Sequence, residues 1–142
     1  MVPERELAAL LSGVYLFEGL PSKLLADVAR AAKVVDHADG ARIMREGERG
    51  YALHVIVEGQ AKVTVGGIDR DVLGPGRYFG ELSLIDDRPR SATVTALGPL
   101  RTVTLTAPAL RVLLLEPEVA HRVMVGLASR LRELEDEVVH GA

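Results

Sequence analysis

Residues 79–94 constrain the fold more than any other part of this sequence. Gly80 permits a tight turn and a close approach of the backbone to a ligand, because glycine has no side chain that could clash. Glu81 then opens a short apolar run that is long enough for about one or two helical turns. Pro89 ends this helix, since its ring blocks helical geometry and favours an extended residue before it. The alternating apolar residues from Ala92 onward predict a strand.

The same stretch carries groups that suit a phosphate. The first backbone amides of a helical turn have no partner within the helix and carry partial positive charge. Arg90 follows the proline and offers a planar fork of donors that fits two phosphate oxygens at once. Ser91 adds a hydroxyl group beside it. A lone arginine after a proline is usually a solvated surface residue, but glycine, acid and arginine occur here together in one short stretch.

The order Phe-Gly-Glu-Leu, a short helix and then Pro-Arg-Ser-Ala-Thr-Val closely resembles the phosphate-binding cassette of the cyclic nucleotide-binding domain family. This family includes the catabolite activator and kinase regulatory subunit types, and residues 79–94 are called the cassette below. The resemblance implies that Arg90 pairs with the cyclic phosphate and that Glu81 accepts a hydrogen bond from the ribose 2′-hydroxyl. Ser83 belongs to the same expected ligand-binding set. The amides expected to complete the cradle are those of Gly80, Leu82, Ser91 and Ala92.

Length and composition indicate one soluble domain. The chain has 142 residues, of which 48% are hydrophobic and 26% are charged, and this profile is typical of a globular protein. Its net charge of −3 lacks the broad positive field that drives non-specific nucleic-acid binding. The absence of cysteine excludes disulfides, thiolate metal sites and thiol redox chemistry. The acidic first residues form neither a signal peptide nor a membrane span, so a cytoplasmic protein is expected.

The segment 1–32 predicts N-terminal helices. Apolar residues at helical spacing indicate a short amphipathic helix over residues 4–11, which ends at a Ser-Gly pair. A second helix is predicted over residues 23–32, with Ser22 as its N-cap. The Leu-Phe-x-Gly-Leu-Pro sequence between them also resembles the N-terminal helical segment of the cyclic nucleotide-binding family.

From residue 33 the hydrophobic period changes to two, which predicts strands. Glycine-containing turns separate short segments at spacings of about ten residues, a pattern typical of a β-sandwich or barrel. The resemblance specifies an eight-stranded β jelly-roll barrel over residues 33–106, within an α+β fold that has N-terminal helices and a long C-terminal helix. The predicted strands cover residues 33–37, 41–45, 52–58, 61–65, 70–73, 92–97 and 100–106.

Two C-terminal helices are predicted within residues 107–139. Pro108 seats the first, and the second covers residues 118–139, about 33 Å at the standard helical rise. Its apolar stripe favours either a coiled-coil dimer or packing on the domain's own barrel, and both interpretations stay open. Several residues here also resemble the dimer helix of the bacterial regulators. The stripe consists of Val119, Val123, Leu127, Leu131, Leu134 and Val138.

The resemblance also bears on how the base of the ligand is held. The positions that reach the adenine edge in the bacterial activator fall at Leu134 and Glu135, where that activator has small hydroxyl side chains. An apolar lid from Leu131 or Leu134 is therefore expected instead. Cyclic-GMP-preferring relatives often have threonine at the place of Ser91, so cyclic AMP is the expected ligand, with cyclic GMP as the alternative.

Other chemistries find little support in the sequence. The four histidines are scattered, with no His-x-His pair, so neither a metal site nor a cupin-type metalloenzyme is expected. No serine lies in a nucleophile elbow and no paired acids suit general acid–base catalysis. Asp86 and Asp87 are interpreted as a solvated turn. No catalytic residues are predicted, and the chain is not expected to be an enzyme.

The function predicted from the sequence is a cyclic nucleotide sensor. Apolar residues of the cassette helix (Leu82, Leu84 and Ile85) are expected to touch the helices after Pro108, so that ligand binding moves those helices. No helix-turn-helix segment follows, so direct DNA binding is not expected, and neither is a membrane partner. The effector is an unknown protein or a domain missing from this chain, and a homodimer through the last helix is possible. The alternative is a ligand-independent dimerisation or interaction module, against which the presence of both Glu81 and Arg90 argues.

Overall fold

The computed structural model describes residues 3–140, without the side chains of Leu82, Ser83 and residues 137–140. The chain begins with helix α1 (Glu4–Ser12), a 3-10 turn η1 (Tyr15–Phe17) and helix α2 (Ser22–Ala31). Both predicted N-terminal helices are therefore confirmed. The predicted N-cap at Ser22 is wrong. Ser22 is already helical, and Pro21 takes the cap position, where its carbonyl accepts a hydrogen bond from the amide of Leu25 at 3.1 Å.

Six strands form one antiparallel sheet that does not close into a barrel. The sheet order is β1-β6-β3-β4, with β2 also paired to β6 and β5 also paired to β3. This arrangement is consistent with a jelly roll in an α+β chain. The strands are β1 (Lys33–His37), β2 (Arg42–Met44), β3 (Ala52–Val65), β4 (Ile68–Leu73), β5 (Tyr78–Phe79) and β6 (Thr93–Thr106).

The prediction of eight strands in a barrel is thus not confirmed, and two glycines explain much of the difference. The segments predicted separately on either side of Gly59 form one strand, β3, and those on either side of Gly98 form one strand, β6. At Gly59 the pairing of β3 with β6 shifts register, and a Cβ there would lie 2.4 Å from the carbonyl oxygen of Pro99. Gly59 therefore marks a bulge where two long strands approach closely, because glycine serves bulges as well as turns.

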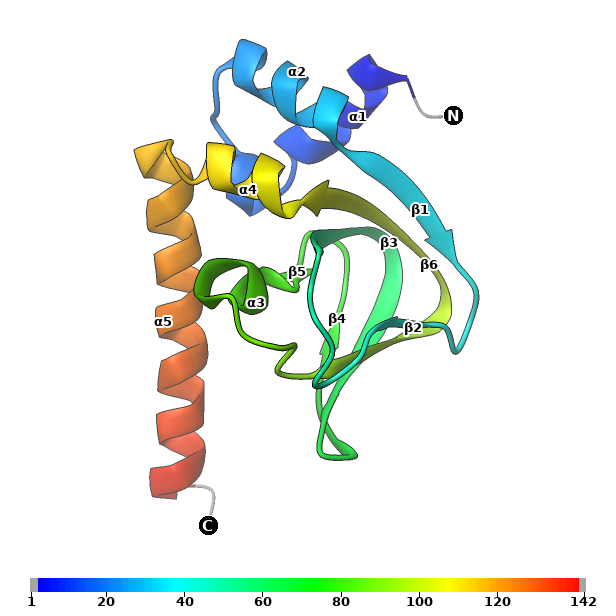
Figure 1. The fold of residues 1–142 in the computed structure, drawn as a ribbon, viewed down its shortest axis with the longest axis vertical. Coiled ribbons are helices and arrows are strands. Elements are labelled where there is room, and N and C mark those ends of the chain that lie inside the picture. Colours follow the sequence, from blue (N-terminus) through cyan, green and yellow to red (C-terminus); the bar gives the residue numbers. More distant parts are fainter. Residues whose placement is uncertain (1–2, 141–142) are drawn as a thin grey trace.

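The helices gather at one end and along one side of the sheet. Figure 1 shows α1, α2 and α4 (Ala107–Leu113) at one end, while α5 (Pro117–His140) runs down the side. The short helix α3 (Glu81–Asp86) lies between α5 and the sheet. Thr106 caps α4, since its hydroxyl oxygen accepts a hydrogen bond from the amide of Ala109 at 3.4 Å. The cassette helix therefore lies where the strands meet the C-terminal helices.

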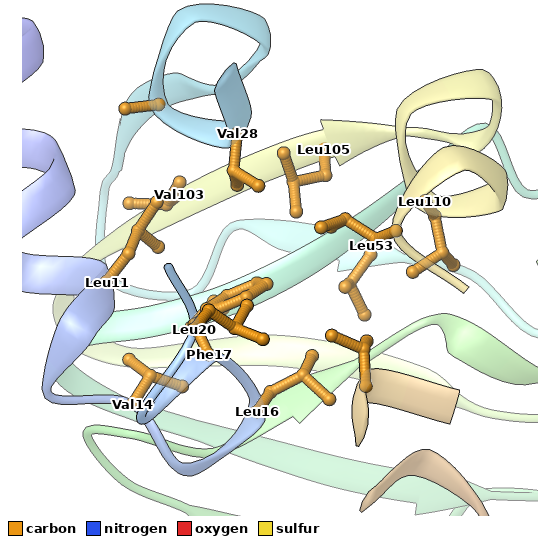
Figure 2. Packing of buried hydrophobic residues seen from close by; sticks show 14 of the residues in the cluster. Leu11, Val14, Leu16, Phe17, Leu20, Val28, Leu53, Val103, Leu105 and Leu110 are labelled. Atoms are coloured by element: carbon orange, nitrogen blue, oxygen red, sulfur yellow. The ribbon is translucent and has the colours of Figure 1, made fainter. Parts of the chain in front are cut away.

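One hydrophobic cluster joins the helices to the sheet. Leu11, Leu16 and Phe17 pack with residues of β3 and β6, including Leu53 and Leu105, and none of these five side chains is exposed (Figure 2). Leu84 of α3 belongs to the same cluster. So do residues of both C-terminal helices, namely Leu110, Leu113, Val119 and Val123. Leu84 of the cassette helix thus shares a buried cluster with the helices after Pro108, whereas Ile85 is 46% exposed.

Helix α5 is buried only in its first half. Val119 and Val123 are buried, while Leu131 is 58% and Leu134 is 55% exposed. The first part of the predicted stripe thus packs on the domain itself, and the second part leaves an apolar surface. The side chain of Val138 lies outside the described part of the chain. Neither α5 nor any other helix in residues 3–140 has the length and apolar composition needed to cross a membrane.

The close approach at Gly59 predicts a large loss of stability on substitution. Gly59 and Gly98 both have a positive φ, 90° and 74°, but a Cβ at Gly98 would meet nothing within 4 Å. Gly98→Ala should therefore cost only the backbone strain, about 1–2 kcal/mol. Gly59→Ala should cost more, because its Cβ would also collide with the backbone of Pro99. Urea unfolding of both variants measures the difference, and equal losses would contradict the bulge assignment.

Candidate functional site

Gly80 fixes the start of the cassette helix. It is the N-cap residue of α3 and has a left-handed φ of 95°. A Cβ at this position would lie 2.6 Å from Nη1 of Arg90 and 2.9 Å from the carbonyl oxygen of Ala52. The positive φ agrees with the tight turn predicted from the sequence, and the close approach to a ligand stays a prediction. In the structure the group that approaches is the guanidinium of Arg90.

Arg90 is a buried cation held by backbone carbonyl groups. Only 7% of it is exposed, and it donates hydrogen bonds to the carbonyl oxygens of Gly80 at 2.8 Å and Ala52 at 2.9 Å. Its own backbone amide donates to the carbonyl of Glu48 at 2.7 Å. Burial lowers the pKa of Arg90, and the negative charge of Glu81 raises it in part. An arginine nevertheless stays protonated at neutral pH, so Arg90 places a fixed positive charge within the cassette.

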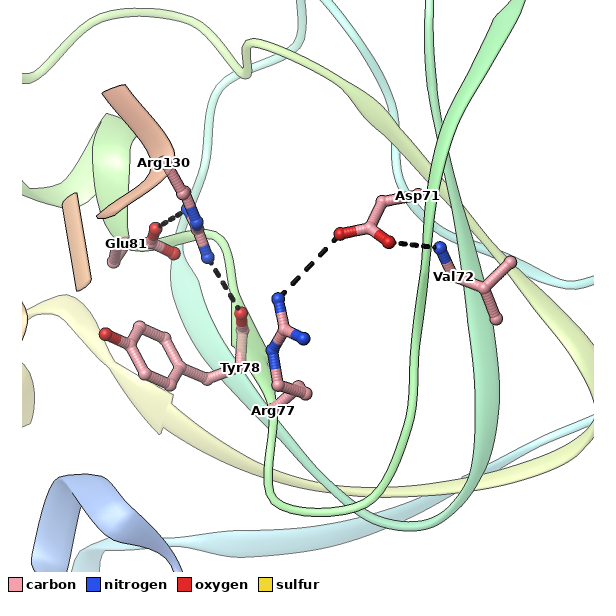
Figure 3. A network of polar contacts seen from close by, with 6 residues as sticks. All are labelled: Asp71, Val72, Arg77, Tyr78, Glu81 and Arg130. Atoms are coloured by element: carbon pink, nitrogen blue, oxygen red, sulfur yellow. Dashed lines mark hydrogen bonds and ion pairs between the residues drawn. The ribbon is translucent and has the colours of Figure 1, made fainter. Parts of the chain in front are cut away.

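Glu81 is a buried acid with one partner and one unsatisfied oxygen. It is 2% exposed, and Nη1 of Arg130 donates a hydrogen bond to its Oε1 within an ion pair. The Arg130 guanidinium also lies over the ring of Tyr78 and donates to the Tyr78 carbonyl at 3.3 Å (Figure 3). Oε2 of Glu81 is buried without a hydrogen-bond partner among the described residues. Such an acceptor is costly unless another group donates to it.

A cavity of about 670 Å³ opens beside these charged groups. Five predicted site residues line it from the cassette, and Leu134 lines it from α5. The five are Gly80, Glu81, Arg90, Ser91 and Ala92. Leu131 is not among the lining residues, so its role as a lid stays a prediction. The side chains of Leu82 and Ser83 lie outside the described part of the chain.

Several lining residues were not predicted from the sequence. Arg130 belongs to the part of α5 that resembles the regulators' dimer helix, but no role was predicted for it. Arg77 and Asp71 lie on the opposite wall, 3.8 Å apart between guanidinium and carboxylate (Figure 3). The floor is apolar and comes from five strands; its residues are Met44, Val63, Val65, Leu73, Phe79 and Val94. Their alternation was interpreted only as packing.

The cavity has the chemistry of a site for a small amphipathic anion. Ligand sites commonly measure 300–1,000 Å³, with apolar walls and a few placed polar groups. Here Arg90 supplies positive charge and Glu81 supplies a buried acceptor, while the strands supply apolar walls. No three acidic or histidine side chains in the described chain are grouped so that they could hold a metal ion.

Comparison with known proteins agrees with this geometry. The sequence profile of the family described as cyclic nucleotide-binding domain matches residues 34–116, more than half of the chain. The chain belongs to the cyclic nucleotide-binding domain family. The match includes the whole cassette, and it includes every residue of the sheet except Lys33. The recognition made from the cassette residues is therefore confirmed.

Individual relatives are regulatory proteins and a gated channel rather than enzymes, as predicted. The chain is 29% identical to a CRP-like cAMP-activated global transcriptional regulator of Mycobacterium tuberculosis, over 91% of this chain and 60% of the regulator. It is 40% identical to a cyclic nucleotide-gated potassium channel of Rhizobium etli, over 80% of this chain and 32% of the channel. The regulatory domain of Toxoplasma gondii protein kinase A, solved with cAMP, aligns with a TM-score of 0.79 at 28% identity. That alignment covers 89% of this chain and 50% of the regulatory domain's chain. The chain thus spans about a third to three fifths of the length of these relatives.

A buried histidine beside Arg90 predicts a dependence of stability on pH. His54 stacks on Phe79 with ring centroids 5.0 Å apart, and its Nδ1 is buried without a partner in the described chain. Burial, reinforced by the positive charge of Arg90, lowers the pKa of His54 from 6.5 to about 4. The unfolded chain therefore binds more protons between these pH values, so the stability from neutral His54 is present above pH 6.5. It is lost as the pH falls toward 4, by about 3 kcal/mol.

Urea unfolding of the wild type and of His54→Phe between pH 7 and 4 measures this contribution. The variant keeps an aromatic ring against Phe79 but has no titrating group, so its free energy of unfolding should fall less steeply with acid. His37→Gln is the matched control, because burial also lowers the pKa of His37, which lies closer to the surface. Identical slopes for wild type and His54→Phe would show that His54 is not held neutral by the fold.

Proposed function

We propose that this domain binds a cyclic nucleotide, cyclic AMP in preference to cyclic GMP, in the large cavity and that binding shifts the position of α5. The observation that carries the proposal is the presence of a buried guanidinium and a buried carboxylate in the lining of one cavity. Arg90 is 7% exposed, Glu81 is 2% exposed, and Oε2 of Glu81 has no donor among the described residues. Burial of a carboxylate and a guanidinium costs desolvation free energy, and a ligand that binds both groups would offset part of that cost.

The phosphate of the ligand would pair with Arg90. Its guanidinium lines the cavity next to the first residues of α3, and a guanidinium suits bidentate contact with phosphate oxygens. Ser91 lines the cavity directly after it and would add a hydroxyl donor. The rest of the proposed cradle consists of backbone amides, with Ser83 in the same set: Gly80, Leu82, Ser91 and Ala92.

The ribose 2′-hydroxyl would donate a hydrogen bond to Glu81. Leaving the buried Oε2 unsatisfied costs about 1–3 kcal/mol, and a ligand hydroxyl at this point would recover part of that cost. The base would then lie between the apolar strand residues and α5. Leu134 lines the cavity from α5 and is the proposed lid, together with Leu131 one helical turn before it. Serine rather than threonine at position 91 favours cyclic AMP.

Arg130 gives a direct route from the ligand to α5. It lies on α5 and forms an ion pair with Glu81, the residue proposed to bind the ribose. A hydroxyl that donates to Glu81 would change the surroundings of this ion pair. Leu84 of α3 packs in one cluster with residues of α4 and α5, so a displacement of α3 would also repack those helices. The ligand can change the equilibrium between the two positions of α5 only by the difference in its binding free energy to the two arrangements.

The proposed output is regulation of another protein or domain. The exposed apolar residues on the second half of α5, including Leu131 and Leu134, favour a homodimer through this helix. The effector would be a partner protein or a further domain. Direct DNA contact is not part of the proposal, because a net charge of −3 gives no broad positive field.

Calorimetric titration with cyclic AMP and cyclic GMP tests the proposal. Wild-type protein should bind cyclic AMP more tightly than cyclic GMP. Arg90→Gln should weaken cyclic AMP binding by about 2–5 kcal/mol, because it removes the cationic partner of a buried phosphate. This is a loss of about thirty-fold or more. Arg42→Gln removes the same charge from an exposed position on β2 and should bind like the wild type.

The outcome also decides between the two candidate functions. Thermal unfolding of each variant confirms that the protein titrated is folded. If folded wild-type protein gives no heat with either nucleotide, the sensor proposal fails. The ligand-independent interaction module, which the exposed apolar side of α5 favours, would then be the remaining candidate.

A further inference from the structure

A second cavity, of about 290 Å³, is lined in part by cassette residues 87–89 and shares no lining residue with the large one. Three arginines line it, and each comes from a different segment of the chain. Arg49 precedes β3, Arg88 follows α3, and Arg111 lies on α4. The cavity thus lies where the end of the cassette meets the first C-terminal helix.

Backbone hydrogen bonds hold these segments together. The amide of Ala107, the first residue of α4, donates to the carbonyl of Tyr51 at 3.1 Å. Two further bonds join the preceding loop to Arg90, from Gly47 to its carbonyl at 2.9 Å and from Arg90 to Glu48 at 2.7 Å. The loop that carries Arg49 is therefore fixed at both sides. These backbone hydrogen bonds hold the Cα atoms of the three arginines around the cavity, although their long side chains can still move.

The charges in this cavity are not balanced. None of the guanidinium groups of Arg49, Arg88 and Arg111 makes a hydrogen bond or an ion pair with a described residue. One carboxylate, that of Asp87, also lines the cavity, so the lining carries three positive charges and one negative charge. A concave site with an excess of one charge concentrates counter-ions of the opposite sign.

We propose that this second cavity is a binding site for the phosphate group of a small phosphorylated molecule. A phosphate monoester carries about −1.5 to −2 charges at neutral pH, which matches the excess of two positive charges here. Guanidinium forks fit phosphate oxygens, and three arginines line this one small cavity. Tyr51 lines the same cavity and is 74% exposed, so its ring is available to stack on a flat group attached to the phosphate.

A bound phosphate would connect the cassette with helix α4, the two elements whose relative movement is part of the proposed response to the nucleotide. It would contact Arg88 at the end of the cassette and Arg111 on α4, and α4 leads into α5. The anion would therefore stabilise the relative position of the cassette and α4 that this structure has. The site itself does not depend on the proposed binding of a cyclic nucleotide, since the two cavities are lined by different residues.

Nuclear magnetic resonance titration of the full chain with inorganic phosphate tests the site. Ionic strength is held constant with sodium chloride, and phenyl phosphate is the second probe. We expect saturable amide shifts at Gly50, Tyr51 and Arg88. Arg49→Gln/Arg111→Gln should weaken this binding by about tenfold or more, because two of three charged contacts are lost. Arg5→Gln/Arg42→Gln, with the same net charge but exposed substitutions elsewhere, should bind phosphate like the wild type.

The two probes distinguish free phosphate from a phosphate ester with a flat group. Phenyl phosphate should bind more tightly than inorganic phosphate, and Tyr51→Ala should abolish that advantage. The proposal is overturned if the saturable shifts occur only at Gly80, Ser91 and Ala92, which line the large cavity. Equal weakening in both double variants would also overturn it, since the effect would then be one of net charge. In Arg90→Gln the phosphate shifts at Gly50 and Tyr51 should persist, even if cyclic AMP binding is lost or never present.

Discussion

The buried carboxylate of Glu81 is the group on which most of the other features of this molecule depend. It forms an ion pair with Arg130 from the distant helix α5, and its charge also acts on Arg90, which follows it in the cassette. A buried ion pair contributes little net stability, because desolvation of both charges offsets their attraction. Gly80, the short helix α3 and the carbonyl groups that bind Arg90 can be understood as the structure needed to keep these charges in place.

This arrangement joins the cavity to the helices. Glu81 begins α3, and Leu84 of α3 shares its hydrophobic cluster with α4 and α5. Gly126 of α5 is also close to β5, the strand that leads into the cassette helix, since a Cβ there would lie 2.9 Å from the hydroxyl oxygen of Tyr78. Hydrophobic packing thus holds the first half of α5 on the domain, and the ion pair of Arg130 holds its middle. The exposed second half is free of such ties among the described residues and is the part that a change at Glu81 would displace most easily.

The sequence predicted those parts of the site whose determinants are local. The turn at Gly80 and the short helix depend on neighbouring residues, and the structure contains both. The helix ends at Asp86, before Pro89 is reached, because Asp87 takes a left-handed conformation with a φ of 59°. Arg130 was missed because its partner is 49 positions away and only folding brings them together. The strands around Gly59 and Gly98 were divided wrongly, because a glycine in a bulge has the same local pattern as one in a turn. The arginines of the second cavity each appear as ordinary surface residues in the sequence, and only their convergence distinguishes them.

Titration with cyclic AMP, followed through the Nε–Hε resonances of the arginine side chains, would show directly whether the ligand reaches both Arg90 and Arg130. We expect the resonances of Arg90 and Arg130 to shift with the same saturation curve. Arg90 should shift because it contacts the phosphate, and Arg130 because its partner Glu81 accepts the ribose hydroxyl. The signal of Arg101, paired with Asp36 away from the cavity, should stay in place. Saturable cyclic AMP binding that leaves the Arg90 and Arg130 signals unchanged would contradict the account.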